Sequence, residues 1–359
     1  MSKFGRLLAA VLLLGSAASS RALEPLSPTA MDEPYTYHIE VLQVTDIGPY
    51  EESYQGFLKT LADNDIALGK NLVVHREKIA SDTERGGFWN RLWVYFQVRA
   101  EAQRIVRAKP DLVLTIGTAA TKYARYALDD DHVPAVFTAV ANPLEIGATS
   151  FRDAGPGLTG ATLYTDIADS LKTVKEIFPE VQKIGMVHSD DENGVAHVQI
   201  TTLKAAAAGI TVSSRQVTKN DGIVPALKQL YQDGAGVQMF AVPLDTYYGL
   251  RNFEPARDLG DFALENRIPV VSLALARVPG AMLYIGADFA TVGGLSAQQA
   301  LKILKRHVKP DVLPILKQDK PTVLIDPERL AALKVALPQA ILERKSVGRN
   351  GFWEIGAAK

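Results

Sequence analysis

The sequence predicts an α/β fold of two lobes, each built on a parallel sheet and joined to the other by hinge crossovers. Short stretches rich in β-branched residues alternate with stretches of helical periodicity, which is typical of a parallel sheet covered by helices on both faces. Two series of such strands run through the chain in the same order. We expect the first series at residues 38–44, 72–74, 111–116 and 133–137, and the second at 183–187, 210–212, 237–242 and 268–271.

The two series also share smaller features. A helical stretch precedes the third strand of each, at 100–108 and 223–232. Pro134 and Pro269 stand at the start of the two fourth strands. Proline has no N–H to donate within a sheet and is confined to first positions or edges, so this shared placement supports two equivalent halves.

The run Gly155-Pro156-Gly157, within residues 150–160, marks the break between the series. After residue 281 the chain offers a strand at 282–285, a helix at about 290–305 and a closing segment at 321–327, too little for a third domain. We predict a signal peptide at 1–22, a flexible lead-in at 23–34, a first lobe at 35–145 plus about 282–320, a second lobe at 146–281 plus about 321–345, and a tail at 346–359.

The N-terminus has the layout of a cleaved secretory signal. Lys3 and Arg6 precede an apolar run at 7–14, and small residues lead to Ala22, after which we predict cleavage. The apolar run is shorter than the ~20 residues that span a bilayer. Because the sequence also has no cysteine for a lipid anchor, we expect a free protein in the periplasm.

Charge and composition exclude several classes of function. Of 39 basic and 40 acidic residues, cleavage removes Lys3, Arg6 and Arg21, which leaves 36 against 40 and a net charge near −4. Nucleic-acid binding normally shows a basic patch, so we expect none. The sequence also lacks the phosphate-loop, zinc-helix, nucleophile-elbow and dinucleotide motifs, and its six histidines have no metal-ligand spacing. We therefore expect no catalytic residue, no cofactor and no metal.

An aromatic segment at 80–97 has no counterpart in the second half. Trp89, Trp93 and Phe96 follow one another at i, i+4 and i+7, which predicts a helix packing these rings onto the lobe. The alternative is an aromatic wall that lines a cleft or contacts a partner.

Candidate binding residues follow the predicted strands. Ligands of open α/β sheets bind beyond the carboxyl ends of the strands, and here those ends carry polar or small residues. Each loop alone is typical of an ordinary connection, but together they predict two polar rims facing a shared cleft. The first half contributes Thr45, Asp46, Gly117, Thr118, Ala119, Asn142 and Thr159. The second half contributes Ser189, Asn193, Asp245, Thr246, Ser272 and, later in the chain, Asp288.

Thr118 stands where a helix begins after the third strand. Free N–H groups and a partial positive charge at such a helix start suit a carboxylate. The alternative is an ordinary helix cap, worth about 1 kcal/mol. His188, at another strand end, is a further candidate contact.

Several segments resemble one family. The chain is similar to the ABC transporter substrate-binding proteins whose characterised members bind aromatic amino acids, and the resemblance covers most of the mature chain. It depends on the order and spacing of residues 55–61, 109–120 and 133–137, then Asn142-Pro143, Leu158-Thr159-Gly160 and Asp326-Pro327.

The resemblance implies a type I periplasmic-binding-protein fold, in which two Rossmann-like lobes joined by three hinge strands close on a ligand. Thr118 and Ala119 match the family's first-lobe cleft loop, Asn193 its second-lobe loop, and Asp245 an acidic position after a later strand. The chain departs from the family in having Asn142 where an aspartate is usual, and in the length of its aromatic segment.

The resemblance further implies a monomer that takes a small amino-acid-like ligand, with an aromatic one as a candidate, to an ABC permease in the inner membrane. Thr118 would hold the carboxylate, and Asp245 or Asp46 would accept from the ammonium group. Two alternatives stay open: a sensor subunit that presents ligand to a membrane receptor, and an α/β enzyme with Asp245 or His188 as a base.

Overall fold

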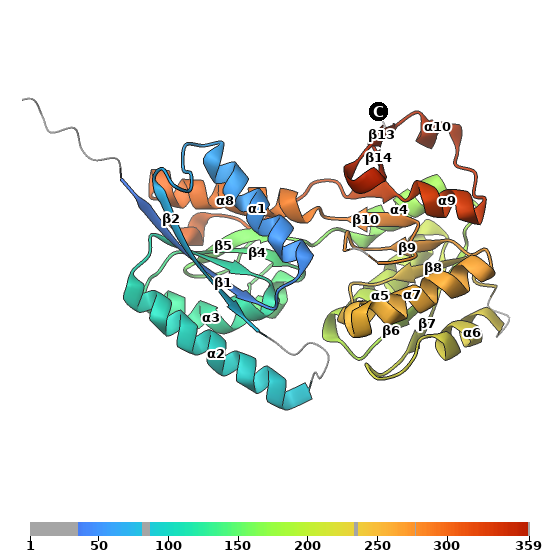
Figure 1. Cartoon of the computed structure of the whole chain (residues 1–359), viewed down its shortest axis with the longest axis horizontal. Coiled ribbons are helices and arrows are strands. Elements are labelled where there is room, and N and C mark those ends of the chain that lie inside the picture. Colours follow the sequence, from blue (N-terminus) through green and yellow to red (C-terminus); the bar gives the residue numbers. More distant parts are fainter. Residues whose placement is uncertain (1–34, 81–86, 233–235, 277, 358–359) are drawn as a thin grey trace, which may run out of the picture. The chain divides into compact units, whose positions relative to one another are not determined.

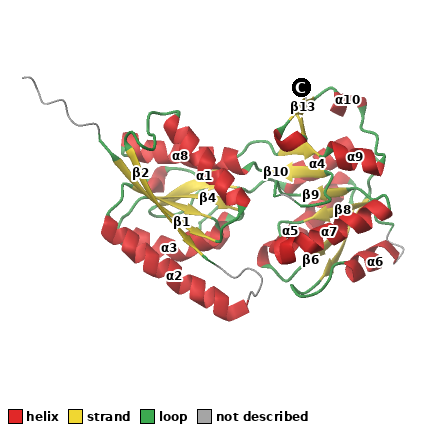
Figure 2. Cartoon of the chain, in the orientation of Figure 1, coloured by secondary structure: helices red, strands yellow, loops and turns green. Residues whose placement is uncertain are grey.

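The first sheet has six strands in the order β11-β5-β4-β3-β1-β2, and every neighbouring pair is parallel (Figures 1 and 2). The computed structural model describes residues 35–80, 87–232, 236–276 and 278–357, so the predicted signal peptide and lead-in lie outside it. The strands are β1 (Tyr37–Val44), β2 (Leu72–Ile79), β3 (Leu112–Ile116), β4 (Ala135–Val140), β5 (Leu158–Thr162) and β11 (Leu316–Lys317).

The second sheet has eight strands in the order β13-β14-β12-β10-β9-β8-β6-β7. From β7 to β10 the neighbours are parallel, whereas β12, β14 and β13 continue the sheet in antiparallel pairs. The strands are β6 (Lys183–His188), β7 (Thr211–Gln216), β8 (Met239–Val242), β9 (Val270–Ser272), β10 (Leu283–Gly286), β12 (Thr322–Ile325), β13 (Lys345–Val347) and β14 (Trp353–Ile355).

Helices cover both faces of each sheet, as parallel strands require. On the first sheet, α1 (Gly48–Ala62) and α8 (Phe289–Arg306) bury one face, and α2 (Gly87–Ala108) and α3 (Thr118–Asp130) the other. The second sheet is covered on one face by α4 (Ile167–Ile177), α5 (Glu192–Ala205), α9 (Pro327–Leu333) and α10 (Gln339–Leu342), and on the other by α6 (Val224–Gln232) and α7 (Leu250–Glu265).

Most predicted strands are confirmed to within a few residues. Pro134 and Pro269 each stand directly before the strands β4 and β9, and their carbonyl oxygens accept from the neighbouring strands. The predicted helix at 290–305 corresponds to α8. Among the described residues, no helix combines the length and the apolar character that crossing a membrane would require.

The chain crosses between the two sheets three times: after β5, after β10 and after β11. The positions of these crossings in the sequence differ from the predicted boundaries between the lobes. Strand β5 pairs with β4 in the first sheet, although residues 146–281 were expected in the second lobe, and β10 pairs with β9 in the second sheet, although 282–320 were expected in the first. The expected tail at 346–359 contains β14, which pairs with β12. Strand pairing decides these memberships, and it depends on contacts distant in sequence.

The aromatic segment packs differently from the prediction. The side chain of Trp93 is 46% exposed and that of Phe96 is 59% exposed, so the expected stripe is wrong for these two, and the Trp89 side chain lies outside the description. Val94, Val98 and Ala102 face the sheet instead. Their i, i+4, i+8 spacing gives α2 a buried face of small and β-branched side chains, which lets the helix lie close to the sheet.

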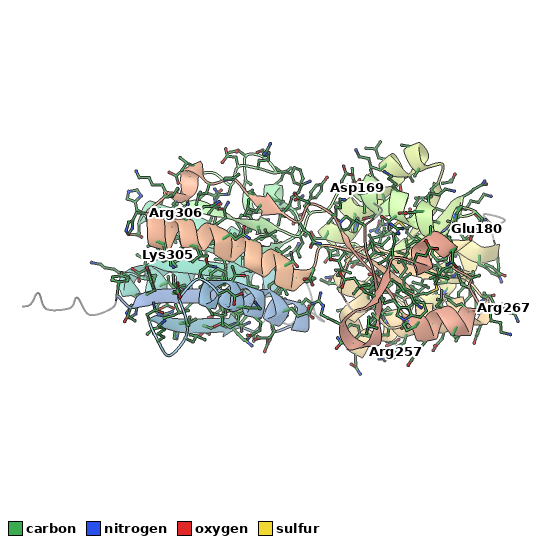
Figure 3. The ribbon with its side chains drawn as sticks, turned by 90° about the horizontal axis from the view of Figure 1, so that it is seen from above. Asp169, Glu180, Arg257, Arg267, Lys305 and Arg306 are labelled. Atoms are coloured by element: carbon green, nitrogen blue, oxygen red, sulfur yellow. The ribbon has the colours of Figure 1, made fainter. Side chains whose placement is uncertain are left out.

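Charged side chains lie at helix ends where they oppose the helix dipole. Lys305 and Arg306 occupy the last turn of α8, and Asp169 occupies the first turn of α4 (Figure 3). These residues stabilise the ends of the helices that flank the crossings.

Candidate functional site

A cavity of about 300 Å³ is lined by segments that follow strands of both sheets. Because ligands of parallel sheets bind at the carboxyl ends of strands, this is where a binding site is expected. Its walls come from the residues after β4 and β5, from α5, and from the ends of β8, β9 and β10. The lining residues are Ala141, Asn142, Glu145, Phe151, Leu163, Tyr164, Thr165, Ile167, Asn193, Ala196, His197, Ile200, Leu244, Leu273, Ala274, Leu275, Gly286, Ala287 and Phe289.

Apolar side chains form most of these walls, which is typical of a site for a small organic molecule. The rings of Phe151 and Tyr164 pack against each other, with their centroids 4.4 Å apart and their planes inclined by 43°. Leucine and isoleucine side chains supply much of the remaining surface. The cavity therefore suits a ligand with a substantial apolar part.

Asn142 and Glu145 provide polar groups on the first-sheet side. Asn142 caps the short helix η1 (Pro143–Ile146), because its Oδ1 accepts from the backbone N–H of Leu144 at 3.1 Å. Its Nδ2 donates to Glu145 Oε1 at 3.4 Å. A carboxylate thus stands in the cavity three residues after Asn142.

The segment that carries these groups is anchored by a buried arginine. Arg125 of α3 donates from Nη1 to the Ile146 carbonyl oxygen at 2.6 Å and from Nη2 to that of Ala154 at 2.8 Å. The guanidinium thus holds both ends of the connection that includes Phe151.

Helix α5 supplies the facing polar groups. Asn193, Ala196, His197 and Ile200 recur at i, i+3, i+4 and i+7, so one face of the helix lines the cavity. The Nδ1 atom of His197 lies 2.7 Å from the backbone nitrogen of Leu244, which also lines it.

A smaller cavity of about 170 Å³ lies against the first sheet alone, where β1 and β3 end. Thr45, Tyr50 and Ala119 line it together with Asn90 and Arg91 of α2. Burial raises the pKa of Tyr50 to about 12, so its phenol is neutral at physiological pH.

Helix α3 begins beside this cavity. Gly117 has φ +86°, and Tyr50 packs so closely over it that a Cβ atom would collide with the phenol. Among the described residues, no side chain caps the start of α3. The helix start that contains Thr118 and Ala119 therefore keeps free N–H groups.

The predicted second-sheet rim forms a hydrogen-bond network centred on Asp245. Its two carboxylate oxygens accept from Ser189 N at 2.6 Å, Ser189 Oγ at 2.9 Å and Tyr247 N at 2.9 Å. Burial raises the pKa of Asp245 and nearby Asp191 adds to this, although the hydrogen bonds from Tyr247 and Ser189 oppose the rise. Thr246 Oγ1 donates to Asp191 Oδ2 at 2.9 Å.

The structure brings some predicted residues together and separates others. Asn142 and Asn193 line the larger cavity, and Thr45 and Ala119 line the smaller one. Gly117 and Thr118 begin α3, while Ser189, Asp245 and Thr246 belong to the network described above.

Four further predicted residues make structural contacts outside both linings. Asp46 pairs with Lys78 at 2.9 Å. Thr159 is buried and donates to the Leu313 carbonyl oxygen at 3.0 Å, and Ser272 donates to that of Ala274 at 2.8 Å. Asp288 caps α8 and pairs with Arg349. His188, considered as a further contact, is also buried, with Nδ1 2.8 Å from the Ser189 carbonyl oxygen.

Sequence reasoning missed Glu145, His197 and Phe151. Phe151 and His197 lie far along the connections after β4 and β6, whereas the predicted residues stand nearer their strands; Glu145 comes three residues after the predicted Asn142. The i, i+3, i+4 pattern that extends from Asn193 along α5 is the signal that could have found His197.

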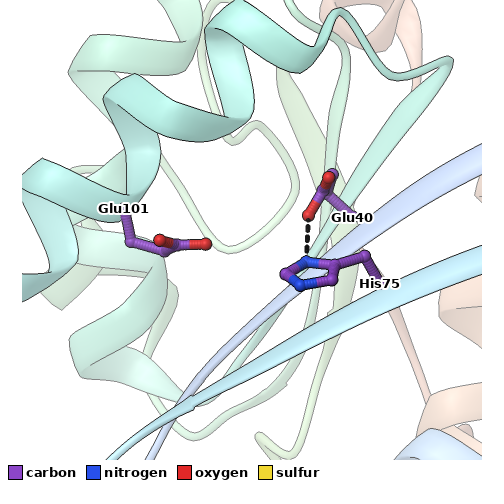
Figure 4. Close-up of side chains that lie close together, drawn as sticks. All are labelled: Glu40, His75 and Glu101. Atoms are coloured by element: carbon purple, nitrogen blue, oxygen red, sulfur yellow. Dashed lines mark hydrogen bonds and ion pairs between the residues drawn. The ribbon is translucent and has the colours of Figure 1, made fainter.

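Glu40, His75 and Glu101 bring possible metal-ligand atoms within 4.8 Å of one another (Figure 4). Arg104 forms ion pairs with both carboxylates: its Nη2 lies 2.5 Å from Glu40 Oε2, and its Nε lies 2.6 Å from Glu101 Oε1. Burial raises the pKa of Glu40, but the hydrogen bonds and charges of Arg104 and His75 outweigh it, so the pKa is lowered. The cluster is an ion-pair network that ties α2 to β1 and β2.

Comparisons with known proteins agree with this architecture. A tyrosine-binding protein from Clostridioides difficile is 23% identical over 307 residues, which cover 82% of this chain and 80% of that protein. A ligand-free, open structure of a substrate-binding protein with adhesive properties from Clostridium difficile superposes with a TM-score of 0.69, at 21% identity, covering 85% of this chain and 97% of the other.

An L-Trp complex from Streptococcus pneumonia superposes with a TM-score of 0.67, at 19% identity, covering 86% of this chain and 98% of the other. A periplasmic ribose ABC transporter protein from Conexibacter woesei gives 0.55 at 13% identity, covering 84% of this chain and 96% of the other. These likenesses establish the two-lobed type I periplasmic-binding-protein fold. The family model described as ABC transporter substrate binding protein matches residues 38–347. This chain therefore belongs to the ABC transporter substrate-binding protein family.

Proposed function

We propose that this protein captures an amino acid with an aromatic side chain and delivers it to an ABC permease in the inner membrane. The observation that supports this most strongly is the 300 Å³ cavity, whose apolar walls and few polar groups come from segments that follow strands of both sheets. The tyrosine-binding relative and the bound L-tryptophan of the pneumococcal structure support the same class of ligand.

In this proposal the protein acts without catalysis. The ligand docks on one lobe, rotation about the three crossings closes the other lobe over it, and polar groups replace its lost water contacts. We place the first lobe at 36–163 plus 287–318 and the second at 164–286 plus 319–357, following the sheet each segment joins.

We propose separate partners for the charged groups of the amino acid. The side-chain amide of Asn193, which lines the same cavity, supplies N–H groups for the carboxylate. Glu145 supplies the acidic group that faces the ammonium, because its carboxylate lines the cavity close to Asn142. Asp245 supports this site through its bonds to Ser189 and Tyr247 rather than by contact with the ligand.

The cell compartment and assembly are part of the same proposal. A signal peptide at 1–22 directs the protein to the periplasm and is cleaved. There the protein meets the permease as a monomer. Sequencing the N-terminus of protein released by osmotic shock tests the location, and Leu23 is the expected first residue.

Isothermal titration with L-tyrosine, L-phenylalanine and L-tryptophan tests the function directly, with tyramine as the matched ligand that lacks the carboxylate. We expect binding of at least one amino acid, none of tyramine, and weaker binding by Glu145→Gln. The proposal is contradicted if none of the three amino acids binds the wild type.

A further inference from the structure

His197 lies in the wall of the larger cavity with one of its two ring nitrogens already engaged. Nδ1 lies 2.7 Å from the backbone nitrogen of Leu244. A backbone N–H can only donate, so Nδ1 accepts, and the proton of the neutral ring is therefore on Nε2.

The second ring nitrogen is available to a ligand. Nε2 has no hydrogen-bond partner among the residues that the structure describes. It is also not among the fully buried side-chain atoms that lack a partner, so it is accessible to a small molecule. His197 lines the cavity, so an Nε2–H directed into this space would meet the ligand. A donor left without an acceptor once water is displaced is costly, so a suitable ligand must satisfy it.

The ring is held neutral, which restricts the acceptor. Burial lowers the pKa of His197 to about 4, so the imidazole carries no charge at neutral pH. A neutral N–H donor in an apolar wall is satisfied by a neutral oxygen, without the cost of burying a further charge. A neutral acceptor at the end of an apolar group fits both constraints.

Resting on the proposed function, we propose that His197 is a specificity-determining residue whose Nε2–H selects an amino acid with a neutral hydrogen-bond acceptor at the far end of its ring, such as a para-hydroxyphenyl group. The phenolic oxygen accepts this bond. A phenyl ring offers no acceptor, and an indole offers only a competing N–H donor.

Two variants separate the two nitrogens of His197. His197→Asn places an amide oxygen near the position of Nδ1, so it keeps the bond from Leu244 and loses the donor toward the ligand. His197→Gln reaches the position of Nε2 with its amide, so it keeps that donor and loses the acceptor for Leu244. A purely structural role predicts damage only in the glutamine variant.

The test measures the affinities of L-tyrosine, L-phenylalanine and L-tryptophan by isothermal titration for the wild type and both variants, with thermal unfolding recorded in parallel. We expect the wild type to bind L-tyrosine about tenfold more tightly than L-phenylalanine, the effect of one neutral hydrogen bond. His197→Asn should lose this preference at an unchanged melting temperature, and His197→Gln should keep it at a lower one.

The outcomes distinguish this inference from the proposed function. Equal affinities for L-tyrosine and L-phenylalanine in the wild type would overturn the inference alone, as would a preference that survives in His197→Asn. Absence of binding of all three amino acids would overturn the proposed function and the inference with it.

Discussion

Gly293 of α8 lies directly against the backbone of Ser53 in α1, so that a Cβ atom at position 293 would penetrate the Ser53 carbonyl group. Ser53 Oγ also donates to the Phe289 carbonyl oxygen at 3.0 Å. The helix that returns from the second sheet is therefore fixed to the first lobe by backbone contact. This contact sets where the crossing after β10 ends.

Gly293→Ala is expected to destabilise the protein. The obstacle is backbone rather than a flexible side chain, so the two helices must separate, and overpacking of this kind costs about 1 to 3 kcal/mol. Gly294→Ala is the matched control, because the new Cβ meets Thr60 Oγ1 at 2.9 Å, a side chain that can rotate away. Both variants gain the same helix propensity. If urea unfolding shows Gly294→Ala to be the less stable variant, the close contact between Gly293 and the Ser53 backbone is contradicted.

Arg125→Met should weaken both stability and ligand binding. The substitution leaves the buried carbonyl oxygens of Ile146 and Ala154 without their donor, at a cost of about 1 to 3 kcal/mol for each group left unpaired. The connection that carries Glu145 and Phe151 then loses its anchor. Lys122→Met, an exposed position on the same helix, should change neither property. If Arg125→Met remains folded and binds the ligand with unaltered affinity, the arginine does not position the binding site.

Asp245→Ala should lower the free energy of unfolding by about 1 to 3 kcal/mol, since it strands the buried N–H of Ser189. Thr246→Val, which removes an exposed hydroxyl that donates to Asp191, should cost less. Chemical denaturation of both variants checks the order. If Asp245→Ala is as stable as the wild type, the carboxylate does not organise the second rim.

The stability contributed by His197 should depend on pH. Its pKa is about 4 in the folded protein against 6.5 as its ordinary value, so between these limits the unfolded chain takes up a proton that the folded chain refuses. Stability from this residue is complete above pH 6.5 and is lost as the pH falls toward 4, by up to about 3 kcal/mol. Unfolding of the wild type and His197→Asn at several pH values measures the difference, because the other titratable groups are common to both proteins. Parallel pH profiles would contradict the buried neutral ring.

The sequence predicted the central strands well because each of them is a short apolar stretch that is nearly continuous, whereas β2 and β7 continue through polar residues beyond the predicted 72–74 and 210–212. Residues 183–187 and 111–116 read as strands whatever their neighbours, since both faces of a parallel strand are buried. The sheet that β5 and β10 each join was not predictable in this way. It depends on pairing with β4 and β9, which the local composition of 158–162 and 283–286 does not specify.

The candidate site was only partly predictable for a related reason. Asn142 and Asn193 follow strands closely and were found by position. His197 was not, because its role depends on the orientation of α5 and on Leu244 in another connection. Asp245 was identified as a ligand contact from its place after a strand, whereas its oxygens are engaged by Ser189 and Tyr247. Which rim residues face the cavity is decided by tertiary contacts.

The central claim is that a solute binds in the cavity lined by segments of both sheets, and filling that cavity tests it most directly. Ala196 is exposed on α5 and lines the cavity, so Ala196→Trp places a large ring in the ligand's space without disturbing the core. Gln199→Trp adds the same ring to an exposed position of the same helix outside the lining. With the amino acid that the wild type binds most tightly, isothermal titration should show binding lost in Ala196→Trp and kept in Gln199→Trp, at similar melting temperatures. Wild-type affinity in Ala196→Trp would contradict the account.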